Sequence, residues 1–284
     1  MNQALFIVWR ESVEALLVIG ILQTWADQQQ RAQRLLGFLW AGVALGLLLS
    51  ALLALLILFA GEAMSGAGNE WFQAGMALVA SLLMVQMVGW MHRHARSLKD
   101  DLHRHADRQL ARQGGIGLLL LAMLAVSREG SETVVFLYGA GARLHGTQLG
   151  LFAIGGVAGL VLSGLSIALL HSSRRFVSWR RFFAISEALL LLLAAGLLVS
   201  ASERIGGQLL AWDLPEMAYS LVGDALWDSS AWLSDSHGPG SFLAGFAGYR
   251  ASPSALTLLV LCGYWLSVGC WLLQRRTGAQ ACPA

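Results

Sequence analysis

Charged residues are scarce in this sequence, and several other absences exclude whole classes of protein. Asp, Glu, Lys and Arg together make up 13% of the chain, whereas soluble domains carry roughly 25%. The three cysteines, Cys262, Cys270 and Cys282, form neither a disulfide framework nor a standard metal pair. The only lysine, Lys99, lies in a polar connection, which excludes a Schiff base to a buried retinal. No GxSxG, HExxH or P-loop pattern occurs, so we expect no enzyme activity.

Long apolar runs are what the sequence has instead. Hydrophobic residues make up 56% of the chain, and runs of about 20 apolar residues are typical of membrane-spanning helices. We predict an all-α polytopic membrane protein with seven transmembrane helices, at 4–25, 35–60, 71–90, 116–140, 150–170, 184–204 and 255–273. No basic region precedes the first run, so we expect it to be retained rather than cleaved as a signal peptide. All seven histidines fall between the runs, which excludes a haem held by two intramembrane histidines.

The basic residues predict how these helices are oriented. Fourteen Lys and Arg residues fall in the connections 25–34, 91–115 and 171–183 and in the tail, all on one side of the membrane. The other side holds only Arg143, Arg204 and Arg250. Because basic residues accumulate on the cytoplasmic side, we expect a multi-pass protein of the cytoplasmic (inner) membrane. Its N-terminus would lie outside and its C-terminus in the cytoplasm.

The two remaining basic residues, Arg10 and Arg128, lie inside predicted helices and belong to a repeated motif. RESVE at 10–14 and REGSE at 128–132 place Arg, Glu and Glu at identical spacing. Small residues that allow close helix packing also recur: Gly42, Gly46 and Ser50, then Gly155, Gly159 and Ser163. Three helices per copy is an odd number, so the second copy is inverted relative to the first. Inverted repeats place substrate sites near the membrane midplane, where the copies meet.

This repeat organises the single integral membrane domain that we predict over 1–284. Its parts are the first three-helix repeat at 1–90, a cytoplasmic basic linker at 91–115, the second three-helix repeat at 116–204, an outer amphipathic region at 205–254, the seventh helix at 255–273 and a cytoplasmic tail at 274–284.

The repeated motifs predict a cluster of charges inside the membrane. Residues three apart share a helix face, so the facing motifs would offer four carboxylates, Glu11, Glu14, Glu129 and Glu132, and two guanidiniums. Intramembrane charges must pair with one another or bind a cation. Two structural Arg–Glu pairs joining the helices are an alternative, but they leave Glu11 and Glu129 unexplained. We therefore favour a site for a hard cation with oxygen ligands, in which Arg10 and Arg128 compensate charge.

Several stretches resemble the oxidase-dependent iron transporter family, which includes the fungal high-affinity iron permease and bacterial ferrous or ferric iron permeases. RESVE and REGSE are similar to that family's paired REGxE motifs, with Ser12 in place of the usual Gly. WMHRHARSLKDDL resembles its cytoplasmic segment after helix three, and LWDSSAWLSDS and FAGYRASPS resemble its outer loop. The resemblance implies import of iron into the cytoplasm, with the motif carboxylates as ligands, iron as substrate and no permanently bound cofactor. The partners it implies are iron ions, membrane lipids and an iron-delivery or oxidase protein in the periplasm or outside the cell. We expect no nucleic acid among its binding partners.

Four further acidic residues are secondary candidates. Glu187 is placed to be an exit ligand or, equally, a partner of Arg180 or Arg181. Glu203 lies in a stretch where members of the resembled family carry a second Glu nearby. Asp224 and Asp228 stand among the tryptophans of the outer region, where acidic groups can concentrate cations at an entrance.

Two other functions stay open from the sequence. One is a permease for another divalent cation, such as manganese or lead. The other is a membrane scaffold or sensor that transports nothing and uses its Arg–Glu pairs to hold helices together.

Overall fold

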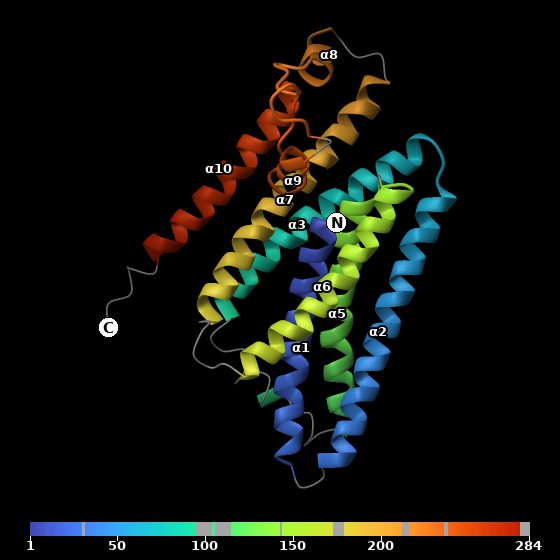
Figure 1. Cartoon of the computed structure of the whole chain (residues 1–284), viewed down its shortest axis with the longest axis vertical. Helices are drawn as coiled ribbons and strands as arrows, with labels where there is room; N and C mark the ends of the chain where they lie inside the picture. The colour runs from blue at the N-terminus through green and yellow to red at the C-terminus, as the bar shows by residue number, and fades with distance from the viewer. Residues whose placement is uncertain are drawn as a thin grey trace. The chain divides into compact units, whose positions relative to one another are not determined.

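In the residues that the computed structural model describes, the chain forms helices joined by turns and loops, with one isolated bridge between Ala225 and Ser254. Those residues are 1–29, 32–94, 104–105, 115–142, 144–172, 179–211, 216–235 and 238–278. Most of the predicted linker at 91–115 and most of the tail lie outside them. The helices are α1 (Asn2–Asp27), α2 (Ala32–Ala63), α3 (Ala67–His94), α5 (Gly115–Gly141), α6 (Thr147–Ser172), α7 (Trp179–Leu210), α8 (Glu216–Gly223), α9 (Gly238–Ala247) and α10 (Ala255–Gly278) (Figure 1).

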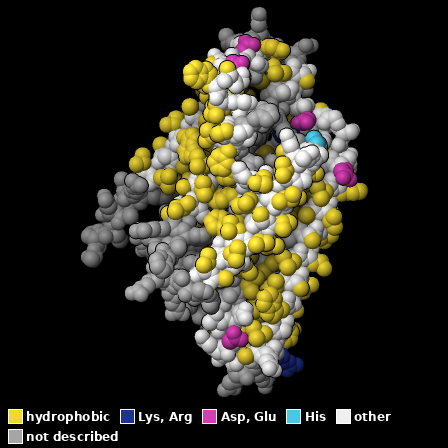
Figure 2. Space-filling view, viewed as in Figure 1, with side chains coloured by type: hydrophobic (Ala, Val, Ile, Leu, Met, Phe, Trp, Pro, Cys, Tyr) yellow, Lys and Arg dark blue, Asp and Glu magenta, His cyan; other side chains and the backbone are white. Residues whose placement is uncertain are grey.

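Each of the seven apolar runs forms a helix, as predicted, and the chain is a multi-pass membrane protein. Among the described residues, five helices are long and apolar enough to cross a membrane by length and composition alone: α2, α3, α6, α7 and α10. The long helices α1 and α5 differ from these in carrying the three charges of one motif each. Leucines dominate the exposed surface of α2 and α6, and hydrophobic side chains cover much of the face seen in Figure 2. Such a surface is expected where lipid replaces water as the solvent.

The chain divides into two compact units. The first combines Met1–Ser65 with Leu82–Leu191, and the second combines Gly66–Ser81 with Leu192–Ala284. The first unit holds α1, α2, α5 and α6 whole, together with the second part of α3 and the first part of α7. The two charged motifs both lie in it, so the first unit carries the candidate site.

Glycine allows two helix pairs of the first unit to pack at very short range. A Cβ on Gly42 of α2 would lie 2.3 Å from the carbonyl oxygen of Leu119 on α5. A Cβ on Gly155 of α6 would lie 2.3 Å from the carbonyl oxygen of Met1, at the start of α1. No side chain fits at either position. Gly42 and Gly155 therefore allow the close helix packing that we expected from small residues. The backbone of α2 therefore packs directly against that of α5, and the backbone of α6 packs directly against that of α1.

These two helix pairs repeat the same contacts. Gly46 faces the Met123 carbonyl and the Ser127 nitrogen on α5, and Gly159 faces the Leu5 carbonyl and the Trp9 nitrogen on α1. Met123 follows Leu5 by 118 residues, the separation that also relates Arg128 to Arg10. Equivalent glycines thus meet equivalent backbone atoms in the two pairs.

The second unit is held together by polar contacts as well as by apolar packing. The Ser81 hydroxyl on α3 donates a hydrogen bond to the Ala194 carbonyl on α7, at 2.9 Å. Arg204 on α7 lies 3.2 Å from Glu70 on α3 and also donates to Gln73. Within the predicted outer region, α8 and α9 are separate short helices, and α8 packs against α10.

Candidate metal site

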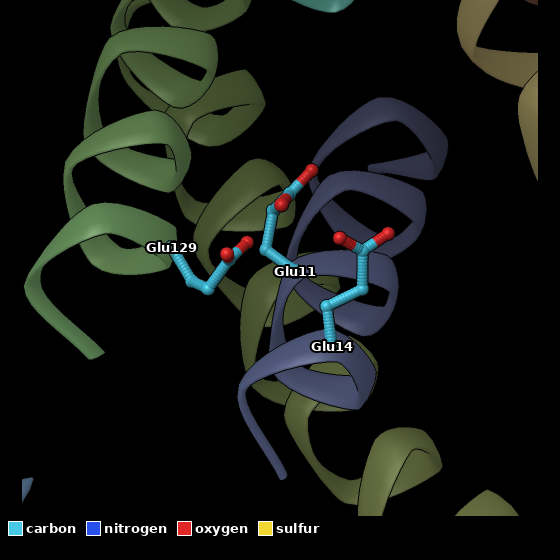
Figure 3. Close-up of side chains that lie close together, drawn as sticks. All are labelled: Glu11, Glu14 and Glu129. Carbon is cyan, nitrogen blue, oxygen red and sulfur yellow. The ribbon is translucent and has the colours of Figure 1, made fainter. Parts of the chain in front are cut away.

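The motif carboxylates of α1 and α5 come together inside the first unit. Glu11 and Glu14 on α1 and Glu129 on α5 each place a carboxylate oxygen within 4.8 Å of the others. Figure 3 shows the Glu129 carboxylate directed from α5 toward the helix that carries the other two. Glu11 is 1% exposed and Glu129 is 8% exposed. Three of the four predicted ligands therefore form one buried group that combines both motifs.

Arg10 neutralises part of this group from within the same helix. Its Nη1 donates a hydrogen bond to Glu11 Oε1 at 2.7 Å. Its Nη2 lies 2.6 Å from Glu14 Oε1, an ion pair whose N–H direction is not aligned for a hydrogen bond. The side chain is buried at 1% exposure. The four-residue spacing of Arg10 and Glu14 is typical of a pair within one helix, whereas nothing in the sequence indicated that Arg10 also pairs with its neighbour Glu11.

Several buried carboxylate oxygens remain without a hydrogen-bond donor among the described residues. They are Glu11 Oε2, Glu129 Oε2 and Glu132 Oε2, together with Glu14 Oε1, which has only its ion pair with Arg10. A buried charged oxygen without a donor is costly, and native proteins contain few of them without a reason. A metal ion is one reason, because carboxylate oxygens are its ordinary ligands.

The second motif has the same spacing but different surroundings. Arg128 Nε donates to Glu132 Oε1 at 3.1 Å, and its guanidinium lies over the Trp90 ring, 4.6 Å from the centroid. The Arg128 side chain is 44% exposed, in contrast to the buried Arg10. Glu132 is thus tied to Arg128 beside the three-carboxylate group, with one oxygen left free of donors.

Two cavities of the first unit reach these carboxylates. One, of about 310 Å³, is lined by Leu83, Gln86, Met87, Trp90, Arg128 and Glu132. The other, of about 260 Å³, is lined by Glu11 and Glu129 together with small residues of α1, α2 and α5, among them Ser12, Ser50 and Gly130. A Cβ on Gly130 would lie 2.1 Å from the Ser50 hydroxyl. Gly130, the glycine of REGSE, therefore leaves the space that the Ser50 side chain occupies in this cavity.

Two methionines of α3 are site residues that the sequence did not point to. Arg10 Nη1 donates to Met87 Sδ at 3.1 Å, and Arg10 Nη2 donates to Met91 Sδ at 3.4 Å. Met84, Met87 and Met91 lie on one buried face of α3, at spacings of three and four residues. That spacing was available in the sequence, but nothing in it indicated that this face meets Arg10.

The secondary candidates lie outside the three-carboxylate group. Glu187 is buried at 8% exposure on α7, and the side chains of Arg180 and Arg181 fall outside the described residues. Glu203 Oε1 accepts a hydrogen bond from Arg250 Nε at 2.5 Å. Asp224 is exposed. Asp228 is also exposed, and hydrogen bonds from the side chain and backbone of Ser230 lower its pKa below the ordinary value.

Comparison with known proteins gives this arrangement a family context. The model of the Iron permease FTR1 family matches residues 1–274. The chain is 29% identical over 278 residues to the ferrous iron permease EfeU of Escherichia coli O6:H1, covering 97% of this chain and 96% of the relative. It is 30% identical over 254 residues to the ferrous iron permease EfeU of Yersinia pestis, covering 87% of this chain and 84% of the relative. No solved structure matches the chain.

Proposed function

Since this chain belongs to the iron permease FTR1 family, a family of transporters rather than enzymes, we propose that it imports ferrous iron into the cytoplasm through the motif carboxylates. Glu11, Glu14 and Glu129 are the ligands, and Glu132 joins them from the adjoining cavity. The proposal of Fe(II) over Fe(III) rests on the relatives, which are ferrous iron permeases.

The observation that carries the proposal is the buried group of carboxylates drawn from two helices. Four carboxylates and two guanidiniums leave a net charge of minus two when all are ionised. Such an excess is unfavourable inside a membrane, where charges must be compensated. One divalent cation restores neutrality, and the oxygens without donors are free to coordinate it. Arginine–glutamate pairs that only join helices would not need these free oxygens.

The architecture we propose around the site is seven membrane-spanning helices, with α1–α3 and α5–α7 as inverted repeats and α10 as the seventh. The recurring glycine contacts support it, because α2 meets α5 in the way that α6 meets α1. Each copy thus packs its second helix against the first helix of the other copy, as expected when two copies are related by a pseudo-twofold axis. The N-terminus would lie outside, as the distribution of basic residues predicts.

The two arginines have different tasks in this proposal. Arg10 is buried against Glu11 and Glu14, so it keeps two like charges close together before the metal arrives. Arg128 is partly exposed beside a cavity that Glu132 also lines. That cavity is suited to be one approach to the site, with Arg128 holding Glu132 in position through its side chain.

Reconstituted transport tests the proposal. Purified protein in liposomes, given ferrous iron under reducing and anaerobic conditions, should accumulate iron in the lumen. Glu129→Gln keeps the side chain's size but removes an anionic ligand, and should abolish most uptake per folded molecule. Glu62→Gln is the matched control, because Glu62 is an exposed carboxylate near the end of α2, and it should transport normally. Normal uptake per folded molecule by Glu129→Gln would contradict transport through this carboxylate group. Absence of uptake by the wild type would instead favour the scaffold function.

A further inference from the structure

The guanidinium of Arg10 lies between two kinds of ligand atom. Its Nη1 is 2.7 Å from Glu11 Oε1 and 3.1 Å from Met87 Sδ. Its Nη2 is 2.6 Å from Glu14 Oε1 and 3.4 Å from Met91 Sδ. Each terminal nitrogen therefore marks a buried point that has one carboxylate oxygen and one thioether sulfur beside it.

Thioethers are a poor choice if their task is only to satisfy the guanidinium. A methionine sulfur is a weak hydrogen-bond acceptor, and a buried arginine requires strong acceptors. Arg10 Nε also lacks a partner among the described residues. An arginine fixed permanently in this place would be better served by a hydroxyl, an amide or a carbonyl oxygen.

Filling of a gap in the core is the other ordinary use of methionine. It accounts for Met84, which is fully buried on the same face of α3. Gap filling does not account for Met87 and Met91, whose sulfurs accept hydrogen bonds from the two terminal nitrogens of one guanidinium.

Thioether sulfur does suit a transition-metal cation. Soft sulfur ligands favour late first-row metals, whereas sites made only of carboxylate oxygen suit magnesium, calcium and manganese. A carboxylate group alone would thus discriminate poorly between ferrous iron and the harder divalent cations that surround it. Adding sulfur to the ligand set would supply that discrimination.

We propose that Met87 and Met91 are specificity-determining ligands, which contact ferrous iron when it takes the place of the Arg10 guanidinium nitrogens beside Glu11 and Glu14. In the absence of metal, the Arg10 guanidinium is the cation that occupies this site between the Glu11 and Glu14 oxygens and the two methionine sulfurs. Four carboxylates, two guanidiniums and one divalent ion sum to zero charge, so the guanidinium shifts within the site and does not leave it. The inference rests on the proposed function, since it names the selectivity of the same site.

The second motif provides a contrast within the molecule. Arg128 faces the Trp90 ring and Glu132 and is partly exposed. An aromatic face attracts a guanidinium but offers no sulfur to a metal. Met87 also lines the cavity beside Arg128, but among the described residues the hydrogen bonds from a guanidinium to a thioether are made by Arg10.

Competition transport tests the inference. We would measure initial ferrous iron uptake into proteoliposomes with rising manganese, comparing the wild type, Met87→Leu/Met91→Leu and Met84→Leu. Leucine conserves the volume of methionine well enough for cores to accept it. The double variant should lose selectivity for iron over manganese by roughly tenfold, the lower end of what losing a metal-site partner costs. Met84→Leu, the matched control on the same face, should keep the wild-type ratio.

A second measurement begins with the wild type, where its first result does not depend on any variant. X-ray absorption at the iron edge of protein loaded anaerobically with ferrous iron should show a sulfur shell as well as oxygen. That shell should weaken in either single variant, Met87→Leu or Met91→Leu. A shell of oxygen or nitrogen alone, or a selectivity ratio in the double variant equal to that of Met84→Leu, would overturn the inference.

These outcomes separate the two proposals. If the wild type transports ferrous iron and Glu129→Gln does not, an unchanged selectivity ratio in the methionine variant defeats only the thioether inference. If the wild type neither binds nor transports ferrous iron, the proposed function itself fails.

Discussion

Replacing Gly159 by alanine should force α1 away from α6. A Cβ at this position would lie 2.4 Å from the Leu5 carbonyl oxygen and 3.0 Å from the Trp9 nitrogen. Ordinary contacts between carbon and a carbonyl oxygen fall at about 3.3–3.6 Å, so the helices must separate by roughly 1 Å. The neighbours are backbone atoms and cannot rotate out of the way.

Gly164 of the same helix supplies a control that isolates the packing effect. A Cβ there would meet nothing within 4 Å. Both substitutions gain the same helix propensity, about 1 kcal/mol for Gly to Ala, and this gain cancels when the variants are compared. What remains is the overpacking cost, typically about 1–3 kcal/mol. Gly159→Ala should therefore be less stable than Gly164→Ala by this amount.

The assay is a pair of measurements on protein purified in mixed micelles. The free energy of unfolding, from denaturation by SDS, should show the difference between the two variants. Iron uptake per folded molecule should fall as well, because α1 carries Glu11 and Glu14, and a 1 Å misplacement can cost about 100-fold in a positioned site. Equal stability and equal uptake in the two variants would refute the packing of α1 on α6 described here.

Three further predictions concern the charged residues. Glu14→Gln and Glu132→Gln should each reduce ferrous iron uptake severely, and the double variant should be scarcely worse, because groups acting as a unit are non-additive; additive losses in liposome uptake would argue against one shared site. Arg10→Lys should also fail in the same assay, since an ammonium cannot reproduce the planar fork that reaches two carboxylates; full activity would show that only the charge matters. Neutralising Asp224 and Asp228 together should raise the iron concentration needed for half-maximal uptake at low salt and leave the maximal rate nearly intact, because ions screen electrostatic steering; loss of the maximal rate would indicate a direct role.

The sequence predicted the long helices, and it indicated which motif glutamates share a helix face, because both signals are local. Each apolar run reports its own helix, and residues three apart share a face whatever packs against it. Close helix packing at Gly42 and Gly155 was also expected from their small side chains, although their partners were not. All of these inferences concern one helix at a time or a repeated pattern.

What the sequence could not predict depends on which helices meet. Arg10 and Arg128 have identical spacing to their glutamates, yet one is buried and the other is 44% exposed. The difference arises because α3 presents Met87 and Met91 to the first arginine and the Trp90 ring to the second. Periodicity indicates that a helix has a buried face, but it does not name the neighbour that covers it.

The most direct test of the central claim is to locate the metal. Crystals of the full chain, grown or soaked with ferrous iron under anaerobic conditions, should give an anomalous scattering peak at the iron edge. The account predicts that peak among the carboxylates of Glu11, Glu14 and Glu129, where the ligand oxygens lie within 4.8 Å of one another. Iron bound only elsewhere on the protein, with these carboxylates paired to Arg10 and Arg128 alone, would contradict it.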